Sequence, residues 1–536
     1  MVVVSLIGGW LCIDSGHEFG DDFILYVDQA ERFWNAGQYR WLELENQWCM
    51  QHSDQLIGPY LYPRGFPGFL SMFIGWKSIL GWKGIKFINY LVFVASAVVF
   101  LIEIGRKFKI RPSHVFLLAA LLIWNPKIWE AADRLQSDLF FTTTVMCFWV
   151  VWWKPIKSIF IRWVVISAIV FIATETKTNG ILLLVPVIFN LGFIWVKSSQ
   201  TKFAFSLSSI LPTQDSGTDL GKARGTVLWA TLSTLCSGFI ALWIERNTGA
   251  NHWSELYASD WTNTMVDNFL QYWGMLGALP VWHVMNGLKL MVSTFGLPLN
   301  LIWLLFATIP IAAFYFLFKV RFNYAVLEMA MFTVSTLLLL TLWPSQQGVR
   351  MLFPILPLWL IMLHQIGISL HAKINFISPK LIQYRKLRNV AFLLVFVQAG
   401  LTAKHYQKID TNQAFSEDML GVANFIKHET ENEAVVSFFK PRLLRYMTGK
   451  RIIRIQNSVN YSGQIIRLDA EVSLDSLVKS DVKYFIAPTW DYQQLLVQVP
   501  KSTGVTNGEL ALIQLKNAQK VYQNRQFVVL DLGHYR

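Results

Sequence analysis

The sequence predicts a mainly α-helical protein that crosses a membrane many times and ends in a small α/β domain. Hydrophobic residues make up 54% of the 536 residues, charged residues only 15%, and the mean hydropathy is +0.38. Apolar stretches long enough to be helices recur over residues 1–402, whereas the hydropathy drops after Leu401. This composition is typical of polytopic membrane proteins and excludes a soluble globular protein.

The distribution of basic residues orients the predicted spans. The formal net charge is +13, a value that would also suit nucleic-acid binding. Lys and Arg gather in alternate loops, however, as they do in the cytoplasmic loops of membrane proteins, so we expect no nucleic-acid partner. The basic loops, assigned to the cytoplasm, are 106–111, 154–157, 197–224, 319–321 and 373–388. The external loops are 14–62, which holds nine acidic and two basic residues, and 133–138, 175–177, 245–267 and 344–350.

The apolar segments between these loops predict about eleven crossings, at about 20 residues for each span. Residues 1–13 are apolar but too short to cross alone, and we expect them to be the end of a longer first span. The other spans are expected over residues 85–105, 113–129, 138–153, 159–174, 178–196, 226–244, 297–318, 323–343, 351–369 and 389–405.

Two further helices are expected to lie along the membrane surface, within an external loop formed by residues 14–84. Over residues 22–36, apolar residues recur at i, i+4, i+7 and i+11, which places them on one stripe of a helix. Residues 66–80 are also apolar, but this segment is only 15 residues long and contains Lys77. If it crossed the membrane, the basic loop 106–111 would lie outside, so we assign it as a second interfacial helix.

Residues 403–536 are predicted to form a water-soluble α/β domain on the external side. Strands and helices alternate there, which is typical of a small layered fold. Helices are expected over residues 415–426 and 441–447, and strands over 434–439, 451–455, 483–487 and 527–532. No glycine-rich phosphate-binding motif opens any of these helices, so we expect a lid or acceptor-docking domain instead of a nucleotide site.

Charged residues in an otherwise apolar chain gather at the predicted external face. The acidic pair Asp21 and Asp22 opens the first interfacial helix, where exposed backbone N–H groups favour ionised carboxylates. We expect these two carboxylates to be catalytic. The candidate residues for binding a phosphate or another part of the substrate are Arg64, Arg134, Asp138, Lys177 and Arg350. Carboxylates and cations at one depth suit transfer from a lipid-phosphate donor.

Each of these residues also has a structural interpretation. Asp21 or Asp22 could be a helix N-cap. Arg134 and Asp138 could form a solvated pair and a cap, Lys177 could pair locally with Glu175, and Arg350 could extend to the lipid headgroups. The four cysteines show no CxxC pair and no His-rich spacing, so no metal site is predicted.

Several motifs, in a common order, resemble the GT-C glycosyltransferases. The motifs are GDD at 20–22, YPRGFP at 62–67, RLQSD at 134–138, ETKTNG at 175–180 and VRMLFPILP at 349–357. The chain is most similar to glycosyltransferase family 39, the branch with protein O-mannosyltransferases and the aminoarabinose transferase acting on lipid A. Residues 439–450 are similar to a stretch in the C-terminal external domain of bacterial members.

The resemblance implies an inverting transferase that uses a polyprenyl-phosphate sugar as donor and a glycan, lipid or protein as acceptor. It assigns the general base to Asp21, with Asp22 at a position often held by Glu. Arg64 departs from the pattern, because many relatives have a second Pro there. The need for a divalent cation stays open. The resemblance fits a bacterial inner membrane with an extracytoplasmic active site. A lipid-linked glycan polymerase or ligase and a secondary transporter are the alternative functions.

Overall fold

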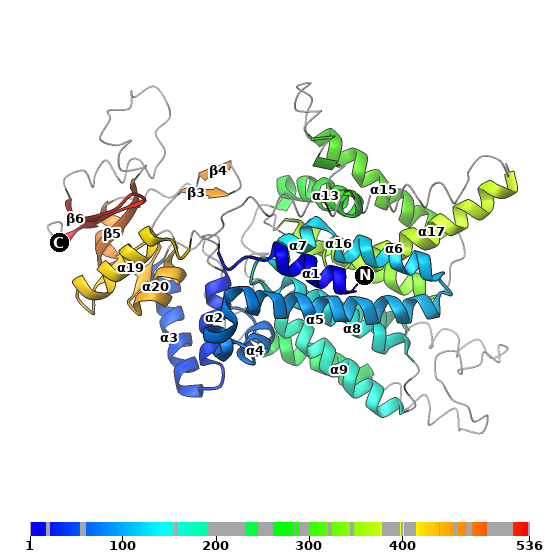
Figure 1. Cartoon of the computed structure of the whole chain (residues 1–536), viewed down its shortest axis with the longest axis horizontal. Coiled ribbons are helices and arrows are strands. Elements are labelled where there is room, and N and C mark those ends of the chain that lie inside the picture. Colours follow the sequence, from blue (N-terminus) through cyan, green and yellow to red (C-terminus); the bar gives the residue numbers. More distant parts are fainter. Residues whose placement is uncertain are drawn as a thin grey trace.

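The computed structural model confirms a mainly α-helical chain with a small sheet near its C-terminal end (Figure 1). The structure describes residues 2–17, 22–53, 61–154, 156, 158–190, 231–244, 261–282, 285–286, 288–289, 300–319, 324–343, 348–377, 397, 400, 414–438, 440–454, 458–461, 464–467, 474–489 and 518–533.

Helices from the first half of the chain pack side by side in the bundle on the right of Figure 1. They are α1 (Val2–Cys12), α5 (Lys77–Lys107), α6 (Pro112–Ile123), α7 (Pro126–Ala132), α8 (Ser137–Trp153), α9 (Ile159–Thr176) and the 3₁₀ turn η2 (Thr178–Leu183). Proline stands at the first position of both α6 and α7, where its missing N–H costs nothing. The expected spans 85–105, 138–153 and 159–174 correspond to α5, α8 and α9.

The second half of the bundle contains one helix that the sequence analysis did not predict. Its elements are α13 (Trp261–Ala278), η4 (Leu279–Val281), α15 (Asn300–Lys319), α16 (Tyr324–Leu342), η5 (Val349–Leu352) and α17 (Leu356–Ile377). The unpredicted helix is α13, which begins inside the acidic segment 245–267. It packs against α15 through Gly274 and Gly277, where side chains would meet the backbone of α15. Small residues such as glycine at a helix interface let the two backbones approach closely.

Three helices are long and apolar enough to cross a membrane among the residues that the structure describes. They are Ile74–Lys107, Asn300–Leu317 and Tyr324–Leu342. The pair formed by α6 and α7, bent by 51°, would be a fourth. The expected span 389–405 and parts of 178–196 and 226–244 lie outside the described residues.

The predicted first external loop contains helices that lie between the bundle and the C-terminal sheet (Figure 1). They are α2 (Asp22–Arg32), α3 (Ala36–His52), α4 (Gly65–Ser71) and η1 (Ile74–Trp76). The expected interfacial helix 66–80 is broken into α4, η1 and the start of α5, which bends at Gly81. Helix α3 was not predicted, although Asn35 caps it by accepting a hydrogen bond from the N–H of Gln38.

The C-terminal elements form the predicted α/β layer. They are α19 (Glu417–Glu429), β1 (Val435–Ser437), α20 (Pro441–Thr448), β2 (Ile452–Ile453), β3 (Ser458–Tyr461), β4 (Gln464–Arg467), α21 (Leu474–Lys479), β5 (Val482–Pro488), β6 (Gln519–Gln523) and β7 (Phe527–Asp531). The main sheet has the order β2-β1-β5-β7-β6, and β3 pairs with β4 in a separate hairpin. Strand β1 is parallel to β2 and β5, whereas β7 is antiparallel to β5 and β6.

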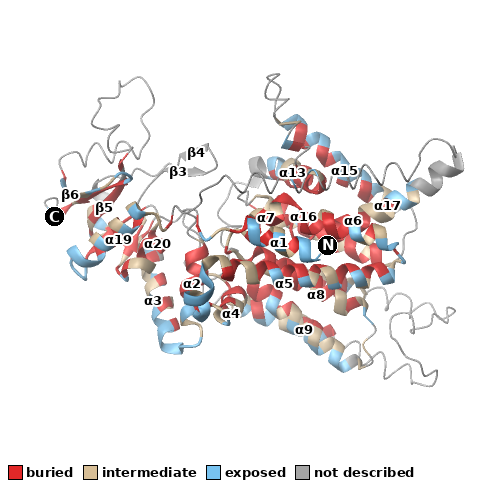
Figure 2. Ribbon diagram, in the orientation of Figure 1, coloured by how far each residue is buried: buried red, intermediate tan, exposed pale blue. Residues whose placement is uncertain are grey.

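Two large apolar clusters hold these parts together, and Figure 2 shows the buried residues that run through them. The first lies within the helical bundle. The second joins the first external loop to the C-terminal layer, because it contains Phe23 and Phe66 together with Met419 and Leu443. Helix α2 is therefore packed on its apolar side against both the bundle and the C-terminal elements.

Candidate functional site

Asp22 lies at the centre of a cluster of charged residues drawn from three distant parts of the chain. Its Oδ1 accepts hydrogen bonds from the Tyr62 hydroxyl at 2.7 Å and from Nη1 of Arg442 at 3.1 Å. Its Oδ2 lies 3.8 Å from Nη1 of Arg350. The other predicted catalytic carboxylate, Asp21, lies outside the described residues. Of the predicted acidic pair, Asp22 is thus the member whose surroundings can be given.

The Tyr62 hydroxyl reaches Asp22 because α2 holds the Tyr62 backbone. Gln29, fully buried in α2, accepts a hydrogen bond from the Tyr62 N–H at 3.1 Å and donates one to the Tyr62 carbonyl at 3.0 Å. The Tyr62 ring stacks on that of Tyr26, with centroids 4.6 Å apart. The YPRGFP segment is thereby fixed to the helix that Asp22 opens.

A second acid–base pair lies beside this group. Lys177 donates a hydrogen bond to the buried Asp138 at 2.5 Å, and its Nζ also lies 3.5 Å from the sulfur of Met351. Met351 follows Arg350 in η5, so this contact joins the turn after α9 to the turn that carries Arg350. Gly348, with a φ of 77°, leads the chain into η5 through a conformation that favours glycine.

Opposing effects set the ionisation of Asp22. Burial alone would raise the pKa of this carboxyl, but the guanidinium of Arg442, followed by Arg350 and the Tyr62 hydroxyl, holds the pKa below its ordinary value of 3.8. Positive charges and hydrogen bonds to a carboxylate favour its charged form. Asp22 is therefore an anion at neutral pH.

The structure brings four of the predicted site residues together, whereas two others form ion pairs outside this cluster. Asp22, Asp138, Lys177 and Arg350 belong to the cluster just described. Arg64 pairs with Glu43 of α3 at 2.7 Å, with its guanidinium over the Tyr39 ring. Arg134 pairs with Glu130 at 3.3 Å, one helical turn earlier in the chain, and its side chain is 40% exposed.

A buried lysine anchors the segment that leads to Asp22. The Lys86 side chain is completely buried, and its Nζ lies 3.4 Å from a carboxylate oxygen of Asp14 and 3.3 Å from one of Asp133. It also donates a hydrogen bond to the Gly16 carbonyl at 2.5 Å. Opposite charges and hydrogen bonds offset the cost of burying a charge at such a depth. Residues 14–16 are thereby tied to α5 and to the turn before α8.

Sequence reasoning missed Arg442. The predicted site residues lie in the first loop and in the loops between predicted spans, whereas Arg442 lies in α20, 420 residues from Asp22. The signal that could have found it is the run Pro441-Arg442-Leu443-Leu444-Arg445, in which basic residues flank two core leucines in a predicted external helix.

The described residues around Asp22 are a poor set for a metal ion. Cations already lie against both carboxylate oxygens. Among the residues that the structure describes, no group of three or more His, Cys, Asp or Glu side chains could hold one.

Comparison with known proteins gives matches of structure and none of sequence. No family model matches the chain, and no curated protein sequence matches it. The apo structure of ArnT from Cupriavidus metallidurans matches 99% of this chain and 96% of its own, with 13% identity and a TM-score of 0.51. The chain has the fold of the GT-C glycosyltransferases.

Two further GT-C structures support the same fold. The oligosaccharyltransferase of Archaeoglobus fulgidus matches 96% of this chain and 71% of its own, with 10% identity and a TM-score of 0.52. The mycobacterial arabinofuranosyltransferase AftD matches 99% of this chain but only 39% of its own, with 10% identity and a TM-score of 0.52. At these identities the likeness concerns the fold. The GT-C likeness extends over nearly the whole chain, including both the bundle and the C-terminal layer.

Proposed function

We propose that this protein is an integral-membrane, inverting glycosyltransferase that moves a sugar from a polyprenyl-phosphate donor to a hydroxyl group on the external side. The observation that supports it most is the cluster of Asp22, Arg350 and Arg442 beside the Lys177–Asp138 pair, in a chain with the GT-C fold. A glycan, a lipid or a protein could supply the hydroxyl. The archaeal neighbour was solved with a tethered acceptor peptide, so a protein is one of the acceptors to test.

In the proposed reaction, Asp21 acts as the general base. It accepts the proton of the acceptor hydroxyl while that oxygen attacks the anomeric carbon of the sugar. The bond between this carbon and the phosphate oxygen breaks, and its electron pair leaves with the polyprenyl phosphate. Attack from the face opposite the phosphate inverts the anomeric centre.

The departing phosphate carries a growing negative charge that fixed cations can stabilise. Arg350 and Lys177 are the first candidates, because they lie in the cluster around Asp22. Arg64 and Arg134 are further candidates once a ligand competes for them with Glu43 and Glu130. Arginine suits this task because its planar fork can bind two phosphate oxygens at once. Asp22 then serves to position these cations.

The domain organisation belongs to the same proposal. Residues 1–402 form the transmembrane catalytic part and residues 403–536 an extracytoplasmic domain. We infer a bacterial inner membrane, in which the active site and this domain face the periplasm. On that side a lipid-linked donor and a cell-envelope acceptor can meet.

The test is a transfer assay with purified protein in detergent. Labelled polyprenyl-phosphate sugars are incubated with candidate hydroxyl acceptors, and the rates of the wild type, Asp21→Asn and Asp22→Asn are compared. Losing a positioned base or charge costs about 2.7–4 kcal/mol, so each variant should lose roughly a hundred- to thousand-fold in rate. Glu103→Gln, which changes an acidic residue near the predicted cytoplasmic end of α5, is the control. Near-normal transfer by well-folded Asp21→Asn and Asp22→Asn would contradict the proposal.

A further inference from the structure

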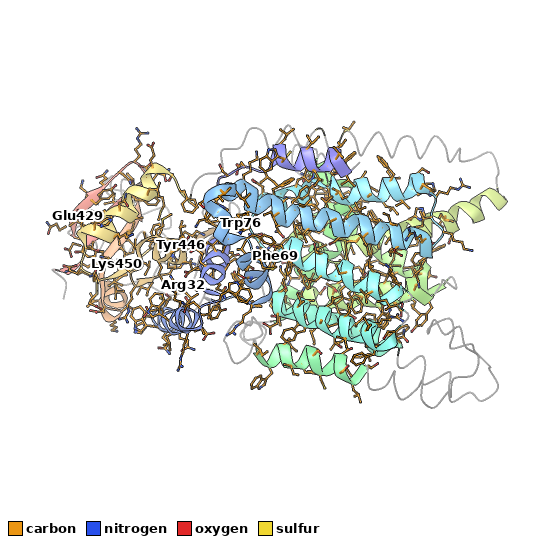
Figure 3. The ribbon with its side chains drawn as sticks, turned by 60° about the horizontal axis from the view of Figure 1, so that its bottom comes forward. Arg32, Phe69, Trp76, Glu429, Tyr446 and Lys450 are labelled. Carbon is orange, nitrogen blue, oxygen red and sulfur yellow. The ribbon has the colours of Figure 1, made fainter. Side chains whose placement is uncertain are left out.

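Helix α20 of the C-terminal layer presents one polar face to the first external loop. Arg442, Arg445 and Tyr446 are spaced i, i+3 and i+4, which places them on the same side of a helix. In Figure 3, Tyr446 lies where the C-terminal elements meet the first-loop helices. The three side chains contact acidic residues spread along α2.

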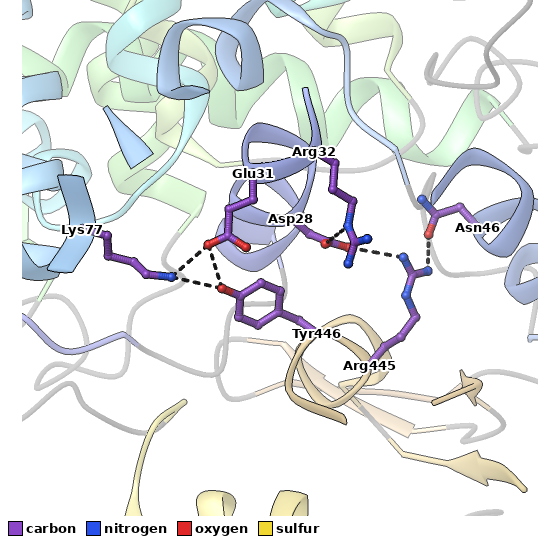
Figure 4. A network of polar contacts seen from close by, with 7 residues as sticks. All are labelled: Asp28, Glu31, Arg32, Asn46, Lys77, Arg445 and Tyr446. Atoms are coloured by element: carbon purple, nitrogen blue, oxygen red, sulfur yellow. Dashed lines mark hydrogen bonds and ion pairs between the residues drawn. The ribbon is translucent and has the colours of Figure 1, made fainter. Parts of the chain in front are cut away.

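Two of these contacts form a network that extends to the neighbouring helices (Figure 4). Arg445 donates to Asn46 of α3, and its Nη2 lies 3.4 Å from Oδ2 of Asp28 in α2. The Tyr446 hydroxyl donates to Glu31 at 3.0 Å and accepts from Lys77 at 3.2 Å. The last turns of α2 are therefore attached to α20, to α3 and to the start of α5.

The third contact reaches the candidate site itself. The Arg442 side chain is only 7% exposed, and it shares Oδ1 of Asp22 with the Tyr62 hydroxyl. Its guanidinium lies 5.8 Å from the centre of the Tyr62 ring. With Oδ1 occupied in this way, the rotation of the carboxylate is fixed, and Oδ2 is the oxygen directed toward Arg350.

Local sequence makes α20 a rigid carrier for Arg442. Pro441 stands at the first helical position, and Gly449 ends the helix with a φ of 71°. Leu443 and Leu444 are completely buried in the cluster that contains Met419 of α19. Because the leucines fix one side of the helix in the C-terminal layer, the arginine on the other side cannot move independently of that layer.

We propose that Arg442 is a positioning residue of the transferase site, supplied by the C-terminal domain, which aligns the Asp22 carboxylate toward Arg350. This inference rests on the proposed function. It gives the C-terminal domain a defined part in the site. Without α20, the Tyr62 hydroxyl would be left to hold Oδ1 of Asp22, and the carboxylate could pair differently with Arg350.

The alternative is that Arg442 only docks the C-terminal domain, and Arg445 makes the comparison possible. Both arginines are equally buried, lie one turn apart on α20 and pair with a carboxylate of α2, but only Arg442 contacts Asp22. If docking were the whole role, Arg442→Gln and Arg445→Gln should have similar effects. If Arg442 positions Asp22, Arg442→Gln should change the rate of transfer and its pH dependence, and Arg445→Gln should not change the pH dependence.

The first measurement is kcat as a function of pH for the wild type, Arg442→Gln, Arg442→Lys and Arg445→Gln. Misaligned catalytic geometry can lower a rate about a hundred-fold, so Arg442→Gln should lose roughly ten- to hundred-fold in kcat, and Arg442→Lys should recover part of it. Arg442 is the group that lowers the pKa of Asp22 most, so Arg442→Gln should raise this pKa and move the acid limb of the profile to higher pH. Arg350, Tyr62 and Lys440 then remain to stabilise the Asp22 anion. Arg445→Gln should leave the acid limb in place. In an Asp22→Asn background, Arg442→Gln should have little further effect.

The second measurement does not depend on transfer. In Arg442→Gln, amide hydrogen exchange should become faster in the first turn of α2, residues 22–26. In Arg445→Gln, it should become faster in the last turn of the same helix.

Equal losses of kcat in both variants with an unmoved acid limb would overturn the positioning role. If the wild type transfers no sugar, the proposed function fails. In that case, faster exchange confined to the first turn of α2 in Arg442→Gln supports positioning, and unchanged exchange overturns it.

Discussion

At the scale of single residues, the central question is how a half-buried carboxylate stays charged. The Asp22 side chain is 30% exposed, and both of its oxygens face donors or cations. The sequence placed an acidic pair at the start of this helix and predicted that backbone N–H groups keep it ionised. The structure adds Tyr62, which lies 40 residues away within the same loop, and Arg442, which lies 420 residues away and which no pattern within the first loop could reveal.

The lowered pKa of Asp22 predicts how acid affects the stability of the protein. Because the folded-state pKa lies below the ordinary value of 3.8, the ion pairs of Asp22 stabilise the fold at pH values above 3.8. This contribution is lost as the pH falls through the folded-state pKa. The difference in melting temperature between the wild type and Asp22→Asn should therefore be largest near neutral pH and should disappear in strong acid.

Thermal unfolding in detergent between pH 7 and pH 3 checks this expectation. Asp418→Asn is the matched control, because Asp418 is also a first-turn carboxylate, in α19. A difference between the wild type and Asp22→Asn that grows as the pH falls would contradict the assigned direction of the pKa shift.

At the scale of helices and strands, continuously apolar segments were predicted well, whereas helices of similar length with more polar residues were missed. The expected spans 138–153 and 323–343 correspond closely to α8 and α16, since a continuous apolar run in a membrane protein has few alternatives to a helix. Helix α3 is polar, so its apolar periodicity is weak and tertiary contacts stabilise it. Helix α13 begins within an acidic segment, and its close packing on α15 depends on glycines that leave no hydrophobic signal.

The packing of α13 on α15 gives a prediction about Gly277. A methyl group there would overlap the Phe306 carbonyl oxygen, so Gly277→Ala must push the two helices apart. Overpacking of this kind typically costs about 1–3 kcal/mol. Gly367→Ala, in α17, makes the same chemical change where nothing lies within 4 Å of the new group. It should be neutral or slightly stabilising, because alanine favours a helix over glycine. Thermal unfolding of both variants is the measurement, and a Gly277→Ala variant as stable as Gly367→Ala would show that α13 and α15 pack differently.

At the scale of the whole molecule, the site is assembled from the first loop, the turn after α9, the turn before α17 and the C-terminal layer. The sequence predicted that the first three converge at one membrane face, because alternating basic loops place them there. It did not predict the fourth, since nothing in the local pattern of α20 says which surface its arginines contact. The order of the motifs correctly indicated the GT-C fold, even though no sequence match accompanies it.

We propose that the cations around Asp22 hold the phosphate of a lipid-linked donor. Affinity for polyprenyl phosphate, measured by native mass spectrometry, tests it most directly on the wild type, Arg350→Gln and the exposed control Arg106→Gln. A hydrogen bond to a charged group contributes about 1.5–3 kcal/mol, so Arg350→Gln should bind roughly ten- to hundred-fold more weakly. Arg106→Gln, which changes a side chain that is 71% exposed near the predicted cytoplasmic end of α5, should bind like the wild type. Wild-type affinity in Arg350→Gln, or an equal loss in both variants, would contradict the account.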